Sequence, residues 1–200
     1  MIGRCIPKKL IPNIFSALVN SHLSYCISVW GGDSNQLVKL FKAQKKTLRS
    51  LFRIKKSRKI NGIWEYGHTK PYFNTHNFLT VHNIYTYSTI IETFKILKSH
   101  EPVSIYNELF SISNINELRL NTPKIRLDAY SNTYYYMAPL LWNTTVTANI
   151  VNNFSLFSLN YFKKHLKIFL MSMQSQFDVN IWHDYNTQFT NFIIHRKTSI

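Results

Sequence analysis

Residues 37–52 read LVKLFKAQKKTLRSLF, and this stretch decides the fold class of the chain. At 100° per residue its side chains fall into two arcs, which is typical of an amphipathic α-helix. The apolar arc contains Leu37, Leu40, Phe41, Gln44, Leu48, Leu51 and Phe52. The arc roughly opposite, which we call the basic stripe, contains Lys39, Lys42, Lys46, Arg49 and Arg53. We therefore expect a helix over residues 36–53 with an apolar face for a core and a basic face.

Residues 11–27 are also expected to form a helix. Pro12 is tolerated in a first turn, and the pair Gly31-Gly32 suits a helix end after Trp30. The apolar face of this helix contains Ile11, Phe15, Leu18, His22 and Cys26, with Val19 and Leu23 widening it. The spacing of His22 and Cys26 could bind zinc, but two ligands do not complete a site. We interpret His22 as a core or subsurface histidine.

Two further long helices follow from the same periodicity. One is expected over residues 81–99, with Thr80 as its N-cap, and a short helix over residues 103–110 should follow it. The last is expected after Ser155, and its periodicity ends at Met173. The four main helices should centre near residues 19, 45, 90 and 164.

The segments between these helices are expected to be less regular. Two glycines and a proline favour a loop over residues 61–79. Residues 118–127 alternate in part like a strand, and the three tyrosines at 134–136 favour extended structure. The predicted fold class is therefore mainly α, with a helical N-terminal half followed by a less regular α+β C-terminal half.

Charge is the most unusual property of the composition. The chain has 200 residues, of which 45% are hydrophobic, so it can bury a core. It carries 24 Lys+Arg against 9 Asp+Glu, a formal net charge of +15. Ten basic residues and no acidic residue lie between Ser34 and Trp64. A chain of this charge is expected to bind a polyanion, which could be nucleic acid, an acidic membrane surface or an acidic protein.

The basic stripe favours nucleic acid among these polyanions. It extends over about 21 Å, and each like-charge pair on a helix costs on the order of a few tenths of a kcal/mol. Phosphates would supply the counter-charge that the sequence lacks. Since the stripe is almost pure lysine and arginine, we expect sequence-independent contacts to the nucleic-acid backbone. The alternative is a solvated face on a basic domain.

No catalytic or metal-binding pattern is recognisable. The four aspartates are isolated along the sequence, whereas metal-assisted phosphoryl transfer needs carboxylates that converge. The five glycines disfavour a glycine-rich phosphate loop, and two cysteines cannot make a four-cysteine zinc site. We therefore expect no catalytic residue, no metal and no cofactor. No stretch is apolar enough to span a membrane, and we expect no membrane partner. The use of only two cysteines fits a reducing compartment, so we expect an intracellular location, in nucleus or cytoplasm.

Five segments of the sequence are more informative together, in their order and spacing, than any one of them alone. They are SHLSYCISVWGG (21–32), LVKLFKAQKKTLRSLF (37–52), LTVHNIYTYSTIIETFKILK (79–98), APLLWN (138–143) and SLNYFKKHLKIFL (158–170). Together they resemble the region downstream of the reverse transcriptase palm in non-LTR retrotransposons of the jockey-like kind, over about residues 7–171. The family commonly continues with Leu-Pro after the fourth of them, where this chain has Thr144-Thr145.

The resemblance implies a helical thumb followed by a C-terminal extension. In such polymerases the thumb packs against the backbone and minor groove of the template–primer duplex. Residues 37–52 would be the thumb helix, the basic stripe would face nucleic acid, and Leu18 and residues 25–30 would pack against that helix. The fingers and the palm, with its aromatic-x-Asp-Asp motif, are missing from this sequence. The missing palm is thus an expected partner, and we expect no polymerase activity from the chain alone.

The periodicity and the resemblance together divide the chain into four expected segments. Residues 1–70 would be the thumb-like region with the basic helix, and 71–110 a helical connector. Residues 111–173 would be the C-terminal extension with short strands and a final helix, and 174–200 a poorly defined tail. Two alternatives stay open: a non-functional translated pseudogene remnant, and a basic module that interacts with proteins or a membrane surface.

Overall fold

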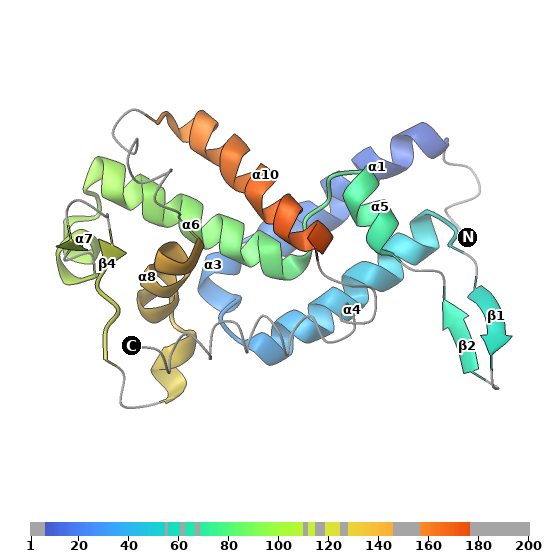
Figure 1. Cartoon of the computed structure of the whole chain (residues 1–200), viewed down its shortest axis with the longest axis horizontal. Coiled ribbons are helices and arrows are strands. Elements are labelled where there is room, and N and C mark those ends of the chain that lie inside the picture. Colours follow the sequence, from blue (N-terminus) through green and yellow to red (C-terminus); the bar gives the residue numbers. More distant parts are fainter. Residues whose placement is uncertain are drawn as a thin grey trace. The chain divides into compact units, whose positions relative to one another are not determined.

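Helices dominate the computed structural model of the chain (Figure 1). The structure describes residues 7–54, 56–60, 63–66, 69–109, 112–114, 119–124, 128–145 and 157–176. Within these ranges the chain is mainly α-helical, which confirms the coarse fold class. It divides into two compact units. The first comprises Met1–Tyr25, Ser34–His82 and Met171–Ile200, and the second comprises Cys26–Asp33 and Asn83–Leu170.

Helix α4 (Ser34–Leu51) confirms the helix predicted from the amphipathic stretch. Its apolar arc faces the core of the first unit, because the side chains of Leu37, Phe41, Gln44 and Leu48 are buried. Leu40 and Leu51, at the margin of the arc, are half-buried. The predicted end at residue 53 is two residues late, since Phe52 and Arg53 form a turn after the helix.

The N-terminal helix is interrupted before residue 27, so that prediction is wrong at its end. The chain passes through η2 (Lys8–Leu10), α1 (Ile11–Ile14), the π-helical η3 (Phe15–Asn20) and α2 (Ser21–Ser24). Tyr25 is then extended, and Cys26 has a φ of 49°, in the left-handed region. Helix α3 (Ile27–Trp30) is a separate turn that follows this break. The spacing of apolar residues continues across Cys26, so it cannot indicate that the backbone leaves the helical conformation at this one residue.

Gly31 and Gly32 follow α3 directly, where the sequence places the helix end. A Cβ atom on Gly31 would collide with the carbonyl of Ile27 and the ring of Tyr85. A Cβ atom on Gly32 would collide with the backbone of Asn132. Glycine is therefore needed at both positions because other parts of the second unit approach closely.

The loop predicted over residues 61–79 is wrong in two places. Strand β1 (Lys56–Ile60) pairs antiparallel with β2 (Ile63–Tyr66), and α5 (Lys70–Thr75) follows. Pro71 lies in the first turn of α5, where no intrahelical N–H is needed, so it begins a helix instead of preventing one. The sequence of β2 is rich in β-formers, with Ile63, Trp64 and Tyr66.

Helix α6 (Val81–Ser99) and the short α7 (Val103–Leu109) confirm the predicted helices at 81–99 and 103–110. The large apolar side chains of α6 are buried, namely Val81, Ile84, Tyr85, Ile90, Ile91, Phe94 and Leu97. Polar side chains of this helix are buried as well, including His82, Asn83, Thr86 and Thr93. A helix buried on nearly all sides is a central element of its fold. Val81 and His82 belong to the first unit, and the rest of α6 to the second.

The α+β character predicted for the C-terminal half is not confirmed. In the described part of that half, strands are limited to β3 (Ile112–Asn114) and β4 (Arg119–Leu120), which pair antiparallel. The 3-10 turn η4 (Asp128–Asn132) leads into α8 (Tyr134–Thr145). The three tyrosines predicted to be extended form the first turn of α8. Tyr136 is buried there, and such burial overrides the weak β preference of tyrosine.

Helix α10 (Leu159–Gln176) is the last described element. Its cap is Ser158, whose Oγ accepts a hydrogen bond from the N–H of Tyr161 at 3.3 Å, while the predicted cap Ser155 lies outside the described residues. The helix continues three residues beyond the predicted end at Met173. Residues 177–200 of the predicted tail lie outside the described ranges.

Within the second unit α10 packs antiparallel to α6 (Figure 1). The rings of Phe94 and Phe162 stack with centroids 4.1 Å apart. Further along, the side-chain amide of Asn83 donates to the carbonyl oxygen of Leu170 at 3.3 Å. Trp142 of α8 lies 6.1 Å from Phe162 and is 1% exposed, so the APLLWN segment places its tryptophan in this core.

Candidate nucleic-acid interface

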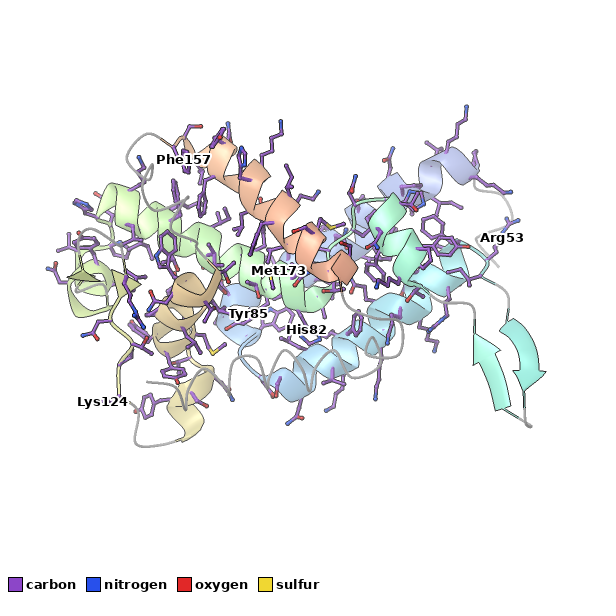
Figure 2. All side chains as sticks on the ribbon, in the orientation of Figure 1. Arg53, His82, Tyr85, Lys124, Phe157 and Met173 are labelled. Atoms are coloured by element: carbon purple, nitrogen blue, oxygen red, sulfur yellow. The ribbon has the colours of Figure 1, made fainter. Side chains whose placement is uncertain are left out.

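The five residues of the basic stripe do not share one environment. Lys39, Lys42 and Lys46 are exposed on α4, on the side away from its buried arc. Arg49 is half-buried. Arg53 is exposed but follows the last residue of the helix (Figure 2). The structure therefore places three lysines of the stripe on one solvent-facing helical surface, at spacings of three and four residues.

Arg53 occupies a special backbone position. Its φ is 51°, and it ends α4 in a Schellman motif. The N–H of Ile54 donates to the carbonyl oxygen of Arg49 at 3.0 Å, and the N–H of Arg53 donates to that of Ser50 at 3.4 Å. Glycine is the usual residue in this position because it has no Cβ. A cation near the end of the helix does interact favourably with the helix dipole.

Lys45 is a cation of α4 that the basic stripe does not include, and it is buried. Only 8% of this residue is exposed, and its Nζ lies 4.3 Å from the centroid of the Phe41 ring. Burial, reinforced by the charges of Arg49 and Lys42, lowers the pKa of Lys45 to about 8. At 100° per residue Lys45 lies beside Phe41 and Phe52, at the margin of the apolar arc. That angular position is the signal from which the burial of Lys45 could have been predicted.

Aromatic side chains hold the buried side of α4 in the first unit. The Phe41 ring lies 5.6 Å from His82, edge to face, and 6.3 Å from Phe73 of α5. At the other end of the helix, the Phe52 ring lies 5.2 Å from Tyr72 and 4.8 Å from His76. These contacts fix the rotation of α4 about its axis, and so they fix which of its cations face solvent.

Gln44 fixes the position of α4 along its axis. Its Nε2 donates to the carbonyl oxygen of Leu79 at 3.0 Å, and its Oε1 accepts from the N–H of Val81 at 3.0 Å. Gln174 of α10 binds the two backbone groups that lie between and before those bound by Gln44. Its side-chain amide donates to the Phe78 carbonyl oxygen at 3.0 Å and accepts from the Thr80 N–H at 3.1 Å. We call these two side chains the glutamine clamp. They satisfy buried backbone groups just before α6 begins, which a core must do.

Of the packing partners that the resemblance implies for this helix, Ile27 and Ser28 are buried, whereas Leu18 and Tyr25 are not. Leu18 is 62% exposed and Tyr25 is 76% exposed, so neither supports α4 from a core position. Instead, Phe15 of the same N-terminal segment is fully buried, with its ring 4.6 Å from Phe78. The η3 segment thus presents Phe15, and not Leu18, to the core of the first unit.

The reading of His22 as a core histidine is wrong. His22 is exposed, and its Nδ1 lies 2.7 Å from the carbonyl oxygen of Leu18. Cys26 is exposed as well, and the break at Tyr25 separates it from the helix of His22, so the two do not share a helical face. Across the described ranges, no three His, Cys, Asp or Glu residues are placed to hold a metal ion. In those ranges no helix combines the length and hydropathy needed to cross a bilayer.

Comparisons with known proteins add no relative. No family model, no curated protein and no solved structure matches this chain. The resemblance to retrotransposon reverse transcriptases therefore stays a prediction from the five sequence segments.

Proposed function

We propose that this chain is a non-catalytic segment of a retrotransposon RNA-directed DNA polymerase that binds template–primer nucleic acid through backbone contacts. The exposed lysines of the basic stripe carry the proposal. Lys39, Lys42 and Lys46 lie on the solvent side of α4, in a stretch without any acidic residue. Their like charges repel one another along the helix, and a phosphate backbone would relieve that repulsion.

The anchoring of α4 supports this proposal. The glutamine clamp and the rings around Phe41 hold the opposite side of the helix, so the lysines project from a rigid element. A rigid, evenly charged helix suits a regular polyanion such as a duplex backbone. Lysine is a point charge without the fixed fork of arginine, and it therefore supports phosphate contacts better than base recognition.

The proposal assigns no catalysis to this segment. Polymerase chemistry needs carboxylates that converge on divalent metal ions. The aspartates of this sequence, Asp33, Asp128, Asp178 and Asp184, are isolated from one another along the chain. Nucleotide addition would belong to the palm that the resemblance expects as a partner. A primer-extension assay with magnesium should accordingly show no incorporation by the chain alone.

Fluorescence anisotropy tests the nucleic-acid contact. The full chain is titrated onto a DNA duplex and an RNA–DNA heteroduplex, each of about 20 base pairs, over a series of KCl concentrations. If all five residues of the stripe make contacts, the slope of log K against log salt should be about −4 to −5 on the DNA duplex. Different duplex sequences should give similar affinities.

A charge-reversal pair makes the test specific to α4. The variant Lys39→Glu, Lys42→Glu, Lys46→Glu should flatten the salt slope by about 3, because each contact contributes about 0.9. Its control reverses three exposed lysines elsewhere, Lys8→Glu, Lys9→Glu and Lys124→Glu, and has the same net charge. An equal loss of duplex affinity and of salt slope in both variants would mean that only the net charge of the chain matters. A wild-type slope near zero would favour a non-functional remnant.

A further inference from the structure

The solvent side of α10 carries a row of aromatic rings. Phe157, Tyr161 and His165 follow one another at four-residue steps. The ring centroids of Phe157 and Tyr161 lie 4.8 Å apart, and those of Tyr161 and His165 lie 4.1 Å apart. Tyr161 is 45% exposed and His165 is exposed as well. Figure 2 labels Phe157 at the beginning of the helix, where the row starts.

Cations accompany this row. Lys164 is exposed one turn after Tyr161, and Lys167 is exposed one turn after Lys164. No acidic residue occurs in the sequence between Asp128 and Asp178, so no neighbour along the chain neutralises them. We call Tyr161, Lys164, His165 and Lys167 the α10 face. It differs from the basic stripe of α4, which offers cations without an aromatic ring among them.

We infer that the α10 face binds single-stranded nucleic acid. A base would stack on the outer face of the His165 ring at the end of the row, because the Tyr161 ring already lies between those of Phe157 and His165. Lys164 and Lys167 would contact the phosphates. Proteins that bind single strands combine aromatic platforms with a cationic track in this way. A paired duplex offers no free base faces to such rings, so the partner of this face is an unpaired strand.

The packing of α10 disfavours an anionic membrane as the partner. An amphipathic helix binds a membrane by inserting its apolar face into the lipid. The apolar face of α10 is already occupied, because Phe162, Leu166 and Leu170 are at most 3% exposed and Phe162 stacks on Phe94. The exposed side retains Ile168 as its aliphatic side chain, at 56% exposure. One such residue offers little area for insertion.

This inference goes beyond the proposed function and does not depend on it. The α10 face lies in the second unit, and the basic stripe lies in the first. The two also differ in ligand: stacked bases of a single strand for one, phosphates of a duplex for the other. Either can fail without the other.

The test measures how the full chain binds a fluorescein-labelled oligo(dT) strand of about 12 nucleotides. A second probe of the same length has the sugar–phosphate backbone but no bases. The wild-type chain should bind the strand without bases about tenfold more weakly, which is the contribution of a stacked base. Equal affinity for both probes would overturn the inference, because phosphates alone would then explain the binding.

Variants locate the contact. Tyr161→Ala with His165→Ala should weaken oligo(dT) binding at least about tenfold, and the preference for the strand with bases should disappear. Tyr161→Phe with His165→Phe should retain both, because a ring remains at each position. The matched control is Tyr130→Ala with Tyr135→Ala, two exposed tyrosines of the same unit, which should bind like wild type. Unchanged oligo(dT) binding by the first variant would overturn the inference.

Two further measurements keep the test decisive. If the alanine variant unfolds, Lys164→Gln with Lys167→Gln should flatten the salt slope for oligo(dT) by about 1.4. An unchanged slope would overturn the phosphate contacts. Vesicles of phosphatidylcholine with about a third phosphatidylserine test the membrane. Vesicle binding that the alanine variant loses, with oligo(dT) binding intact, would make the face a membrane contact instead. The α4 charge-reversal variant should keep the base preference even where duplex binding is lost.

Discussion

Gln44 and Gln174, from two helices far apart in the sequence, both form hydrogen bonds with the backbone of residues 78–81. Each uses both ends of its side-chain amide, and the groups they bind alternate along residues 78–81. Both side chains are at most 1% exposed. The segment leads into α6, so its backbone N–H groups are those that a helix N-terminus leaves without intrahelical partners. Side-chain amides thus do here what neighbouring strands do in a sheet.

Removal of either glutamine should destabilise the chain strongly. Gln44→Leu or Gln174→Leu leaves one buried N–H and one buried carbonyl without their partner. We expect a loss of about 3 kcal/mol in the free energy of unfolding for each, measured by urea denaturation. The control Asn160→Leu changes an exposed amide of α10 and should shift stability by less than about 0.5 kcal/mol. Losses as small in the glutamine variants would contradict the clamp.

Asn143 should behave in the same way in the second unit. Its Nδ2 donates to the carbonyl oxygen of Leu120 at 2.7 Å, and its Oδ1 accepts from the N–H of Leu120 at 2.9 Å. Leu120 is 2% exposed, so Asn143→Ala should cost about 2 kcal/mol in thermal or urea unfolding. Thr144→Ala is the neighbouring control. The Thr144 hydroxyl donates to carbonyl oxygens of its own helix, so a smaller loss of stability is expected. A loss as large as that of Asn143→Ala would contradict a special role for the two hydrogen bonds between Asn143 and Leu120.

Lys45 should make stability rise with pH. The unfolded chain keeps the proton of this lysine up to about pH 10.5, while burial lowers the pKa in the folded chain to about 8. Between these values the unfolded state holds more protons, so stability increases with pH, and below about pH 8 the cost of the buried charge is fully present. Between pH 7 and pH 9.5 the free energy of unfolding of wild type, measured relative to that of the Lys45→Met variant, should rise by about 2 kcal/mol.

The window for that measurement ends before the tyrosines titrate. Burial raises the pKa of Tyr134 to about 12 and raises that of Tyr85 as well. Their stabilising contribution is therefore lost above about pH 10, where unfolded tyrosine begins to ionise. The control is Lys39→Met, at an exposed site of the same helix. Its free energy of unfolding relative to wild type should stay constant from pH 7 to pH 9.5. A flat difference for Lys45→Met would mean that the folded chain keeps this lysine in water.

Arg53→Gly should separate a structural effect from a binding effect. Glycine relieves the left-handed backbone at this position, so we expect the free energy of unfolding to rise by about 0.5–1 kcal/mol. If Arg53 also contacts phosphate, the salt slope on a DNA duplex should flatten by about 0.9. Ser50→Gly, inside α4, should instead lower stability by up to about 1 kcal/mol. A loss of stability in Arg53→Gly would contradict the Schellman motif.

The sequence by itself determined the features that depend on neighbours three and four residues away. The periodicity of residues 36–53 and 81–99 predicts α4 and α6 closely, because each helix must bury a continuous arc whatever it packs against. The same arcs separated Lys39, Lys42 and Lys46 from the core side, and the structure leaves these three exposed. The concentration of positive charge between Ser34 and Trp64 is likewise a property of the sequence alone.

Tertiary structure decided the features that depend on contacts distant along the chain. Gln44 reaches a carbonyl 35 residues away and Gln174 reaches one 96 residues away, and no local pattern encodes such partners. Burial in the second unit turned the tyrosines at 134–136 into the start of a helix, against their β preference. Packing around Phe41 took Lys45 out of solvent. In each case the energy of one residue depends on which distant groups surround it, and those groups are brought together only by the fold.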